Sequence, residues 1–326
     1  MNVLVTGGAG YIGSIVTEHL LKQRHNVTVL DNLQQGHKEA VLSPAEFVSG
    51  DICDAKTLER VFRRSRIDAV MHMAADTLVG YSMTDPKRYF HNNLVGGISL
   101  LNAMLEHGVN KIIFSSTAAV YGEPQNTPIE EAHPKAPINS YGQSKLMFET
   151  VLDWYRRAYG IECISFRYFC AAGATELLGE DHRPETHLIP NILKVALNKD
   201  NTVSVFGTDY PTKDGSCIRD FIHVADVAQA HLLALEKVDS LSGNVYNLGN
   251  GEGYSVLEVI KVAEKIVGRN IPVKFSPRRP GDPVTLIASS KQAAKELGWK
   301  PEFPELGSIM ESAWRWLQAH PHGYKQ

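Results

Sequence analysis

The sequence lacks any long apolar run. No apolar stretch approaches the roughly 20 residues that a membrane-spanning helix needs, so we expect no membrane segment. The N-terminus also lacks the form of a signal peptide, because residues 3–6 already read as a strand that feeds the motif after it. These absences favour a protein that remains in the cytoplasm.

Paired cysteines and excess charge of one sign are missing as well. The only four cysteines, Cys53, Cys163, Cys170 and Cys217, form no Cys-x-x-Cys pair, which argues against a disulfide framework or a zinc cluster. A formal net charge of −3 leaves no electrostatic footprint for nucleic acid or an anionic membrane. We therefore expect free thiols, no bound metal and no nucleic-acid partner.

A glycine-rich loop stands near the N-terminus. The β-branched run at residues 3–6 has the length of a buried parallel strand, and Gly7 to Gly13 follow it directly. The helical pattern over 12–23 would then present its N-terminus to a phosphate. Strand, glycine turn and helix in this order predict a dinucleotide-binding loop, built from Gly7, Gly10, Tyr11, Ile12 and Gly13.

Asp31 ends the second predicted strand, over 27–30. An acid about 20 residues past the glycines accepts hydrogen bonds from the ribose hydroxyls and repels a 2′-phosphate, which favours NAD over NADP. Asn32 beside it could share the ribose. We expect the adenine edge at Asp51 and Ile52, and a close approach of the cofactor at Met73, Ala74 and Ala75, where a fourth strand runs into small residues.

Strands alternate with helices through residue 170, which predicts an α/β fold with a Rossmann-type doubly wound parallel sheet. With 326 residues, 43% of them hydrophobic, the chain has room for two packed domains. We expect an NAD-binding domain over 1–170 and a smaller α/β substrate domain over 171–326. A return segment near 218–245 is expected to pack on the first domain, and a short strand at 246–249 is expected in the second half.

Tyr141 and Lys145 are one turn apart on a predicted helix and therefore share a face. Ionising a phenol near pH 7 requires its pKa to fall by about three units, or about 4 kcal/mol. One positive charge about 4 Å away contributes about that much at an effective dielectric of about 20. We therefore expect Lys145 to make Tyr141 an acid/base group, with Thr117 hydrogen-bonded to the same substrate oxygen.

Two arginines in the second half, Arg219 and Arg279, stand at separate turns. Their planar donor forks could clamp a diphosphate, although each arginine alone could equally be a solvated surface residue.

At this point the chain resembles the UDP-glucose 4-epimerase family, a branch of the extended short-chain dehydrogenase/reductases. The similarity runs almost end to end. In the first half it rests on residues 5–14, 30–33, 50–52, 92–93, 114–122 and 141–145, and in the second on 206–212, 214–215, 219–224, 246–249 and 278–282. The stretch from Phe206 to Val224 points most specifically to the epimerases.

The resemblance implies that UDP-galactose and UDP-glucose are interconverted with tightly held NAD. Tyr141, as phenolate, would take the proton of the sugar 4-hydroxyl, Thr117 would position that oxygen, and Lys145 would bind the nicotinamide ribose. A 4-keto sugar would turn about its diphosphate link before hydride and proton return. The resemblance adds Asn92, Ser115 and Tyr168 to the cofactor site, and Cys170, His187, Leu188, Phe206 (uracil face) and Asp282 (ribose) to the substrate site.

Three positions depart from the usual pattern of the family. Cys170 replaces an asparagine whose amide contacts substrate, and a thiol is a poor donor. His187-Leu188 replaces an Asn-Leu pair. Leu286 stands where some members carry a bulky tyrosine, so we expect possible activity on UDP-N-acetylhexosamines.

Other functions are alternatives to this one. A nucleotide-sugar 4,6-dehydratase needs an acid pair after the threonine, and Thr117 is followed by Ala118-Ala119. A UDP-glucuronate 4-epimerase or decarboxylase, or another nucleotide-sugar epimerase, is the nearer alternative, and a non-catalytic NAD-binding sensor is the alternative from another class. By resemblance, a homodimer is expected through the helices after Asn92 and around Tyr141.

Overall fold

The computed structural model describes residues 1–198, 201–279 and 281–325. Seven strands, all parallel, form the main sheet in the order β11-β6-β5-β4-β1-β2-β3. They are β1 (Asn2–Thr6), β2 (Asn26–Asp31), β3 (Glu46–Ser49), β4 (Ala69–His72), β5 (Lys111–Thr117), β6 (Glu162–Tyr168) and β11 (Val245–Leu248). The strand order reverses between β1 and β4, which is where such sheets open a crevice at the carboxyl ends of the strands. The predicted doubly wound α/β class is confirmed.

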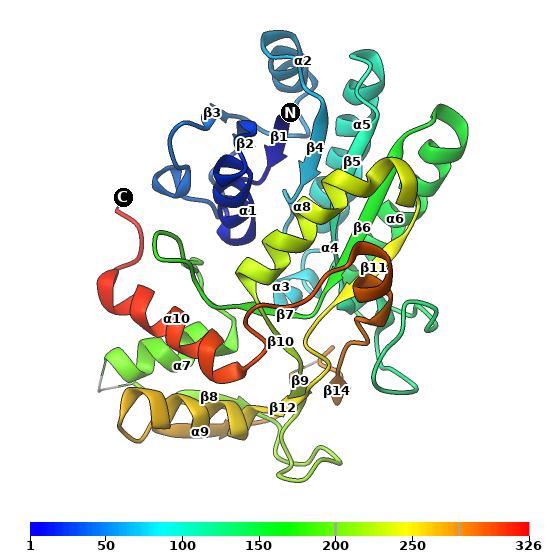
Figure 1. The fold of residues 1–326 in the computed structure, drawn as a ribbon. Helices are drawn as coiled ribbons and strands as arrows, with labels where there is room; N and C mark the ends of the chain where they lie inside the picture. The colour runs from blue at the N-terminus through cyan, green and yellow to red at the C-terminus, as the bar shows by residue number, and fades with distance from the viewer. Residues whose placement is uncertain (199–200, 280, 326) are drawn as a thin grey trace.

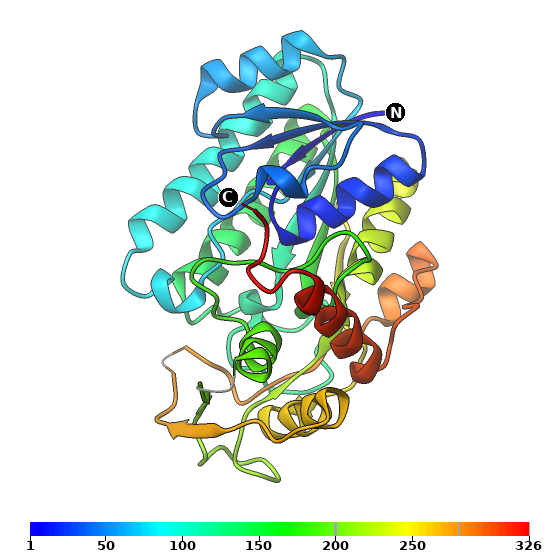
Figure 2. The same cartoon turned by 90° about the vertical axis from the view of Figure 1, so that its left-hand side faces the viewer.

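Helices cover both faces of this sheet (Figures 1 and 2). On one face α1 (Tyr11–Lys22) and α8 (Val224–Leu241) pack side by side, and their apolar residues share a core with the strands. The opposite face is covered by α2 (Ala55–Arg64), α5 (Gly96–Glu106) and α6 (Ser140–Tyr159). Burial on both faces explains why the strands are continuous β-branched runs rather than alternating ones. Within the described ranges, every helix is too short or too polar to cross a membrane.

The position of β11 differs from the expectation for residues 246–249. These residues were expected among the elements of the second half, but Val245–Leu248 pair in parallel with β6 at the edge of the main sheet. Tyr246 and Leu248 are fully buried there. A short apolar run does not say which strand it will pair with, so the sequence pattern had no means of placing it.

The second half of the chain builds a smaller α/β unit at the carboxyl ends of the main strands (Figure 1). Its apolar core lies among three helices and several short strands. The helices are α7 (Leu188–Leu197), α9 (Val256–Val267) and α10 (Leu306–Ala319). The strand pairs and triplet are β7 (Cys170–Ala172) with β10 (Phe221–His223), β8 (Val203–Phe206) with β13 (Val273–Ser276), and β9 (Ile218–Arg219) between β12 (Tyr254–Ser255) and β14 (Thr285–Leu286).

The helix expected after Asn92 is preceded by an irregular turn. Residues Phe90–Val95 form a π-helical turn, and the regular helix α5 starts only at Gly96. The remaining short elements are α3 (Val79–Ser82), α4 (Pro86–Tyr89), a second π-helical turn at Ala293–Leu297, and 3-10 turns at Lys38–Ala40 and Ala118–Tyr121. Such turns follow from local hydrogen bonding that apolar periodicity does not report.

A buried ion pair fixes α6 against the sheet. Arg167 of β6 donates through Nε and Nη2 to the two carboxylate oxygens of Glu149, at 3.0 and 2.6 Å. Both side chains are more than nine-tenths buried. Glu149 also accepts from the Ser116 hydroxyl, and Arg167 Nη1 donates to the Tyr121 hydroxyl at 2.8 Å. Because Tyr141 and Lys145 are on the same helix as Glu149, this network sets their position relative to β5.

We predict that Arg167→Met destabilises the protein by about 3–5 kcal/mol, because Glu149 is left as an uncompensated buried charge. The measurement is the free energy of unfolding from denaturant titration. Arg157→Met is the matched control, since Arg157 pairs with Asp153 on the same helix with 59% of its side chain exposed, and such a pair contributes less than about 1 kcal/mol. Equal losses in the two variants would contradict the anchoring role.

Candidate active site

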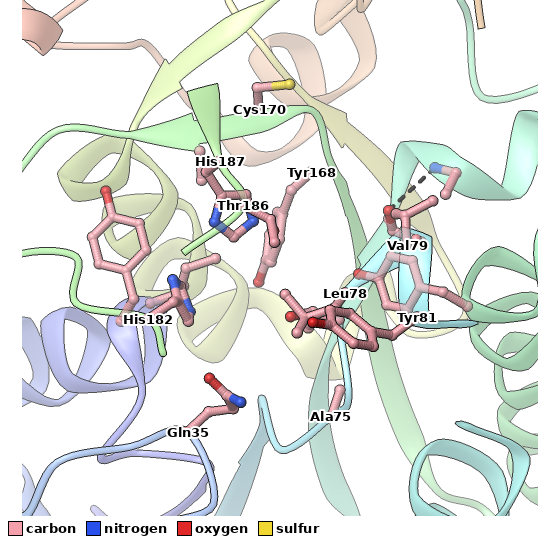
Figure 3. Close-up of a pocket in the computed structure, with 18 of the residues that line it drawn as sticks. Gln35, Ala75, Leu78, Val79, Tyr81, Tyr168, Cys170, His182, Thr186 and His187 are labelled. Carbon is pink, nitrogen blue, oxygen red and sulfur yellow. Dashed lines mark hydrogen bonds between the residues drawn. The ribbon is translucent and has the colours of Figure 1, made fainter. Parts of the chain in front are cut away.

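One cavity of about 1180 Å³ lies between the main sheet and the smaller unit. Side chains from segments far apart in the sequence surround it, including Gln35, Ala75, Tyr168 and His187 (Figure 3). Every residue expected at the site lines it. From the cofactor set these are Gly7, Gly10, Tyr11, Ile12, Gly13, Asp31, Asn32, Asp51, Ile52, Met73, Ala74, Ala75, Asn92, Ser115, Tyr141, Lys145 and Tyr168, and from the substrate set Thr117, Cys170, His187, Leu188, Phe206, Arg219, Arg279 and Asp282.

The glycine loop has the bare backbone that a pyrophosphate requires. A Cβ at Gly13 would lie 2.2 Å from the Gly7 carbonyl oxygen, and one at Gly7, where φ is +72°, would lie 2.5 Å from the Ala74 nitrogen. At Gly10 the nearest atom to a Cβ would be the Gly7 oxygen at 3.3 Å. A side chain at this position would therefore be crowded only by the glycine loop itself. The residues present therefore fit a dinucleotide whose phosphates approach the N-terminus of α1.

Asp31 is the last residue of β2, and Asp51 lies just after the end of β3. Asp31 accepts from the backbone N–H groups of Ala9 and Leu33 at 3.0 and 2.8 Å, which holds the loop and the following turn together. Burial raises the pKa of Asp31, and these two hydrogen bonds oppose the rise. Asp51 accepts from the Asn32 amide at 2.9 Å. A carboxylate oxygen has a second lone pair, so Asp31 can still accept from a ribose hydroxyl.

The three expected catalytic residues come from the end of β5 and the start of α6. Asn139 caps α6 by accepting from the Gly142 N–H at 2.8 Å, so that Tyr141 and Lys145 fall in the first two turns. Thr117 is the last residue of β5, and its hydroxyl accepts from the Ala119 N–H at 3.1 Å. The Thr117 side chain opposes the rise in the pKa of Tyr141, and both residues line the same cavity.

Burial dominates the electrostatics of this group. It raises the pKa of Tyr141, and the hydrogen bond from Thr117 opposes the rise. Lys145 Nζ donates to the Ser115 carbonyl at 2.8 Å and lies 4.8 Å from the centre of the Phe114 ring. Burial also lowers the pKa of Lys145 to about 7, against the pull of Glu149. The expected lowering of the tyrosine pKa by Lys145 stays a prediction.

Tyr168 places a second phenol on the cavity wall. Its hydroxyl donates to Nε2 of the buried His231 at 2.6 Å, while Nδ1 of His231 donates to the Val227 carbonyl at 2.9 Å. This chain of hydrogen bonds fixes the tautomer of His231 and keeps Tyr168 neutral, with a pKa raised by burial.

The residues expected to hold UDP are already partnered with one another. Arg219 donates to Asp282 at 3.1 Å. The guanidinium of Arg279 lies 3.9 Å from the centre of the Phe206 ring, over the face expected to stack on uracil. Pro280, which stands between Arg279 and Asp282 in the sequence, lies outside the described residues. The two arginines are thus held in place by an acid and an aromatic ring, so they are not two free cations.

Cys170, at the start of β7, is half-buried on the cavity wall. Burial raises the pKa of its thiol to about 12, so the side chain is neutral at physiological pH. It offers the substrate a weak donor in place of an amide.

Sequence reasoning missed a group of residues next to His187. Glu180, His182 and Glu185 also lie in the segment between β7 and α7, and their carboxylate and imidazole atoms come together with those of His187. The pattern Glu-x-His-x-x-Glu-x-His over 180–187 was a readable signal. The prediction of no bound metal rested on the absence of Cys-x-x-Cys pairs, which says nothing about histidine and carboxylate ligands.

Comparison with known proteins places these features in a family. Residues 3–249 match the model of the NAD dependent epimerase/dehydratase family. A curated relative, the UDP-glucose 4-epimerase of Halalkalibacterium halodurans, is 52% identical over 99% of this chain and 98% of its own. A crystal structure of a UDP-glucose 4-epimerase superposes with a TM-score of 0.96 at 46% identity and full coverage of both chains. Another, from Bifidobacterium longum in complex with NAD+ and UDP, has a TM-score of 0.95 at 41% identity, covering 99% and 100%.

Proposed function

Because the chain belongs to the NAD dependent epimerase/dehydratase family, we propose that it interconverts UDP-galactose and UDP-glucose with bound NAD. It is an isomerase, and it resembles the UDP-glucose 4-epimerases along its whole length, as the sequence predicted. The observation that carries the proposal is the position of Thr117, Tyr141 and Lys145 in the same cavity as the glycine loop.

The reaction requires a proton to leave the 4-hydroxyl oxygen and a hydride to leave C4 of the hexose. The hydride then returns to the other face of C4, and the proton returns to the oxygen. Bound NAD supplies the hydride acceptor and donor. Tyr141 removes the proton of the 4-hydroxyl and later returns it, and Thr117 orients that oxygen. Lys145 binds the nicotinamide ribose and, when charged, favours the phenolate. Burial raises the pKa of Tyr141, and the positive charges of Lys145 and of an oxidised nicotinamide ring would both oppose that rise.

Inversion also requires the sugar to turn while its nucleotide stays bound. Arg219 and Arg279 hold the diphosphate, Phe206 packs on the uracil, Asp282 binds a ribose hydroxyl, and Cys170, His187 and Leu188 line the hexose region. A neutral, weakly bonding thiol at Cys170 suits a sugar that must rotate. The reaction therefore requires firm binding of the nucleotide and loose contact with the hexose.

We also propose the division into two domains that the sequence predicted. Residues 1–170 bind NAD, with the return segment near 218–245 packed on them, and residues 171–326 bind the UDP-sugar. Support comes from α8, which covers α1. The end-to-end similarity to UDP-glucose 4-epimerases does not favour the glucuronate epimerase or the non-catalytic sensor. The cytoplasmic location stays a prediction.

A homodimer forms through α5 and α6. The support is a set of exposed apolar side chains on and beside these helices, namely Val95, Met147, Trp154 and Tyr159, which are 39–64% exposed. Large apolar side chains gathered on one face mark an interaction surface. The two helices lie on the outer side of the sheet, away from α1 and α8 (Figure 1).

We predict that Tyr141→Phe lowers kcat for UDP-galactose by about 10²- to 10⁴-fold, the range that a general acid/base contributes. NAD content, measured in the supernatant of denatured protein, should be unchanged. Tyr254→Phe is the control, because Tyr254 lies outside the cavity and its hydroxyl donates to Glu252. Wild-type turnover by Tyr141→Phe would refute the assignment.

The space beside Leu286 predicts the substrate range. Leu286 is half-buried on the cavity wall, and its short side chain leaves room for an acetamido group. We expect epimerisation of UDP-N-acetylglucosamine, and we expect Leu286→Tyr to abolish it while changing UDP-galactose turnover by less than about tenfold, since the tyrosine ring fills only that space. Product analysis by chromatography measures both. Turnover of UDP-glucose with none of the acetamido sugar in the wild type would remove this idea.

For the dimer, we predict that Trp154→Glu yields a monomer in sedimentation or light scattering at micromolar concentration, because a charge replaces a large apolar contact. Phe275→Glu is the control, since Phe275 of β13 is 55% exposed but lies far from α6 in sequence and fold. A monomeric wild type, or dissociation by both variants alike, would contradict the assignment to α5 and α6.

A further inference from the structure

The segment between β7 and α7 contains a compact group of potential metal ligands. Glu180, His182, Glu185 and His187 each offer one ligand atom, and these atoms all lie within 4.8 Å of one another. The rings of His182 and His187 lie next to each other, with centroids 5.0 Å apart, on the same side of the cavity (Figure 3). The cysteine pattern of the sequence had predicted no bound metal.

The contacts within the group converge on one point. The Nδ1 atoms of His182 and His187 lie 3.0 and 2.8 Å from the same oxygen of Glu180. His187 Nδ1 is also 3.0 Å from Glu185 Oε1, and His182 Nδ1 is 3.9 Å from Glu185 Oε2. These separations bracket the roughly 3.4 Å between neighbouring ligand atoms in a tetrahedral zinc site with bonds of about 2.1 Å.

One buried atom at this point lacks a partner among the described residues. Glu185 Oε2 has no hydrogen bond, although the side chain is only 5% exposed. Its Oε1, by contrast, accepts from the backbone N–H groups of Thr186 and His187 at 2.8 Å. The ammonium of Lys194 stands 4.0 Å from Oε2, too far for a hydrogen bond. A buried carboxylate oxygen left without a donor is costly unless a cation satisfies it.

The formal charges of the group also suit a divalent cation. Glu180 and Glu185 each offer a carboxylate, and the two imidazoles offer neutral nitrogen ligands. One divalent ion would balance the two carboxylates and would give Glu185 Oε2 a ligand bond.

We propose that Glu180, His182, Glu185 and His187 bind one Zn²⁺. Two imidazole nitrogens and two carboxylate oxygens suit zinc better than calcium or magnesium, which prefer oxygen alone. Four protein ligands close the coordination sphere, which is typical of a structural site. Nε2 of His187 is left free to face the substrate region.

The consequence would be a stiffer cavity wall. Tyr11 of the glycine loop packs edge-on against His182, with ring centroids 6.2 Å apart, and donates to the Gly173 carbonyl at 2.6 Å. The proposed ion would therefore connect the segment between β7 and α7 to the helix that receives the dinucleotide phosphates. Its role is independent of the hydride chemistry.

The test uses the untagged full chain, stripped with a chelator and titrated with ZnCl₂ in a calorimeter. We expect one Zn²⁺ per chain, release of protons from the ligands, seen by changing the buffer, and a higher melting temperature. Co²⁺ should give visible d–d absorption without the charge-transfer band of a cysteine ligand. No stoichiometric binding, or a thiolate band, would overturn the proposal.

Variants locate the site. Glu185→Gln and His182→Gln should weaken Zn²⁺ binding by at least about 100-fold, the upper end of the cost of losing even an outer-shell partner. Glu176→Gln, an exposed residue of the same segment, should bind as the wild type does. Equal affinity in all three would refute the assignment. If the two ligand variants fail to fold, the Co²⁺ spectrum and proton release of the wild type decide alone. Neither readout depends on epimerase activity.

Discussion

The buried pair between Arg167 and Glu149 is the constraint on which the geometry of the cavity depends. Eight residues separate Tyr141 from Glu149, about 12 Å along a helix, and a helix transmits its position rigidly over that length. Arg167 points from β6 to the face that α6 covers, and its neighbour Tyr168 points to the face of α8, where it meets His231. Successive residues of one strand thus fix the two walls between which a nicotinamide ring and a hexose would sit.

Charges around the cavity are balanced within the protein. Arg219 is paired with Asp282, Arg279 lies on Phe206, and His187 lies between two glutamates. If the two arginines bind a diphosphate as proposed, that ligand would have to compete with these partners. The benefit would be orientation, because each cation is held at its place before the ligand arrives.

The sequence predicted those parts of the molecule that depend on local patterns. The glycine loop, the order of strands and helices to residue 170 and the family all follow from short motifs whose spacing has a direct physical meaning. The place of β11 and the π-helical turn before α5 could not be predicted, because they depend on distant strand pairing and on backbone detail. The contact of Lys145 could not be predicted for a similar reason. Spacing on a helix shows that two side chains share a face but not that the Nζ of Lys145 donates to the Ser115 carbonyl. The roles of the individual site residues stay predictions.

The pairing of α1 with α8 has a consequence for how the chain is made. One continuous core joins Val3 and Ile15, near the N-terminus, to Val238 and even Tyr324. On the ribosome, more than two hundred residues must emerge before the apolar side of the first strands and of α1 receives its cover. A nascent chain of this protein therefore exposes the apolar face of an incomplete sheet for much of its synthesis, and such surfaces make partly folded chains prone to aggregate.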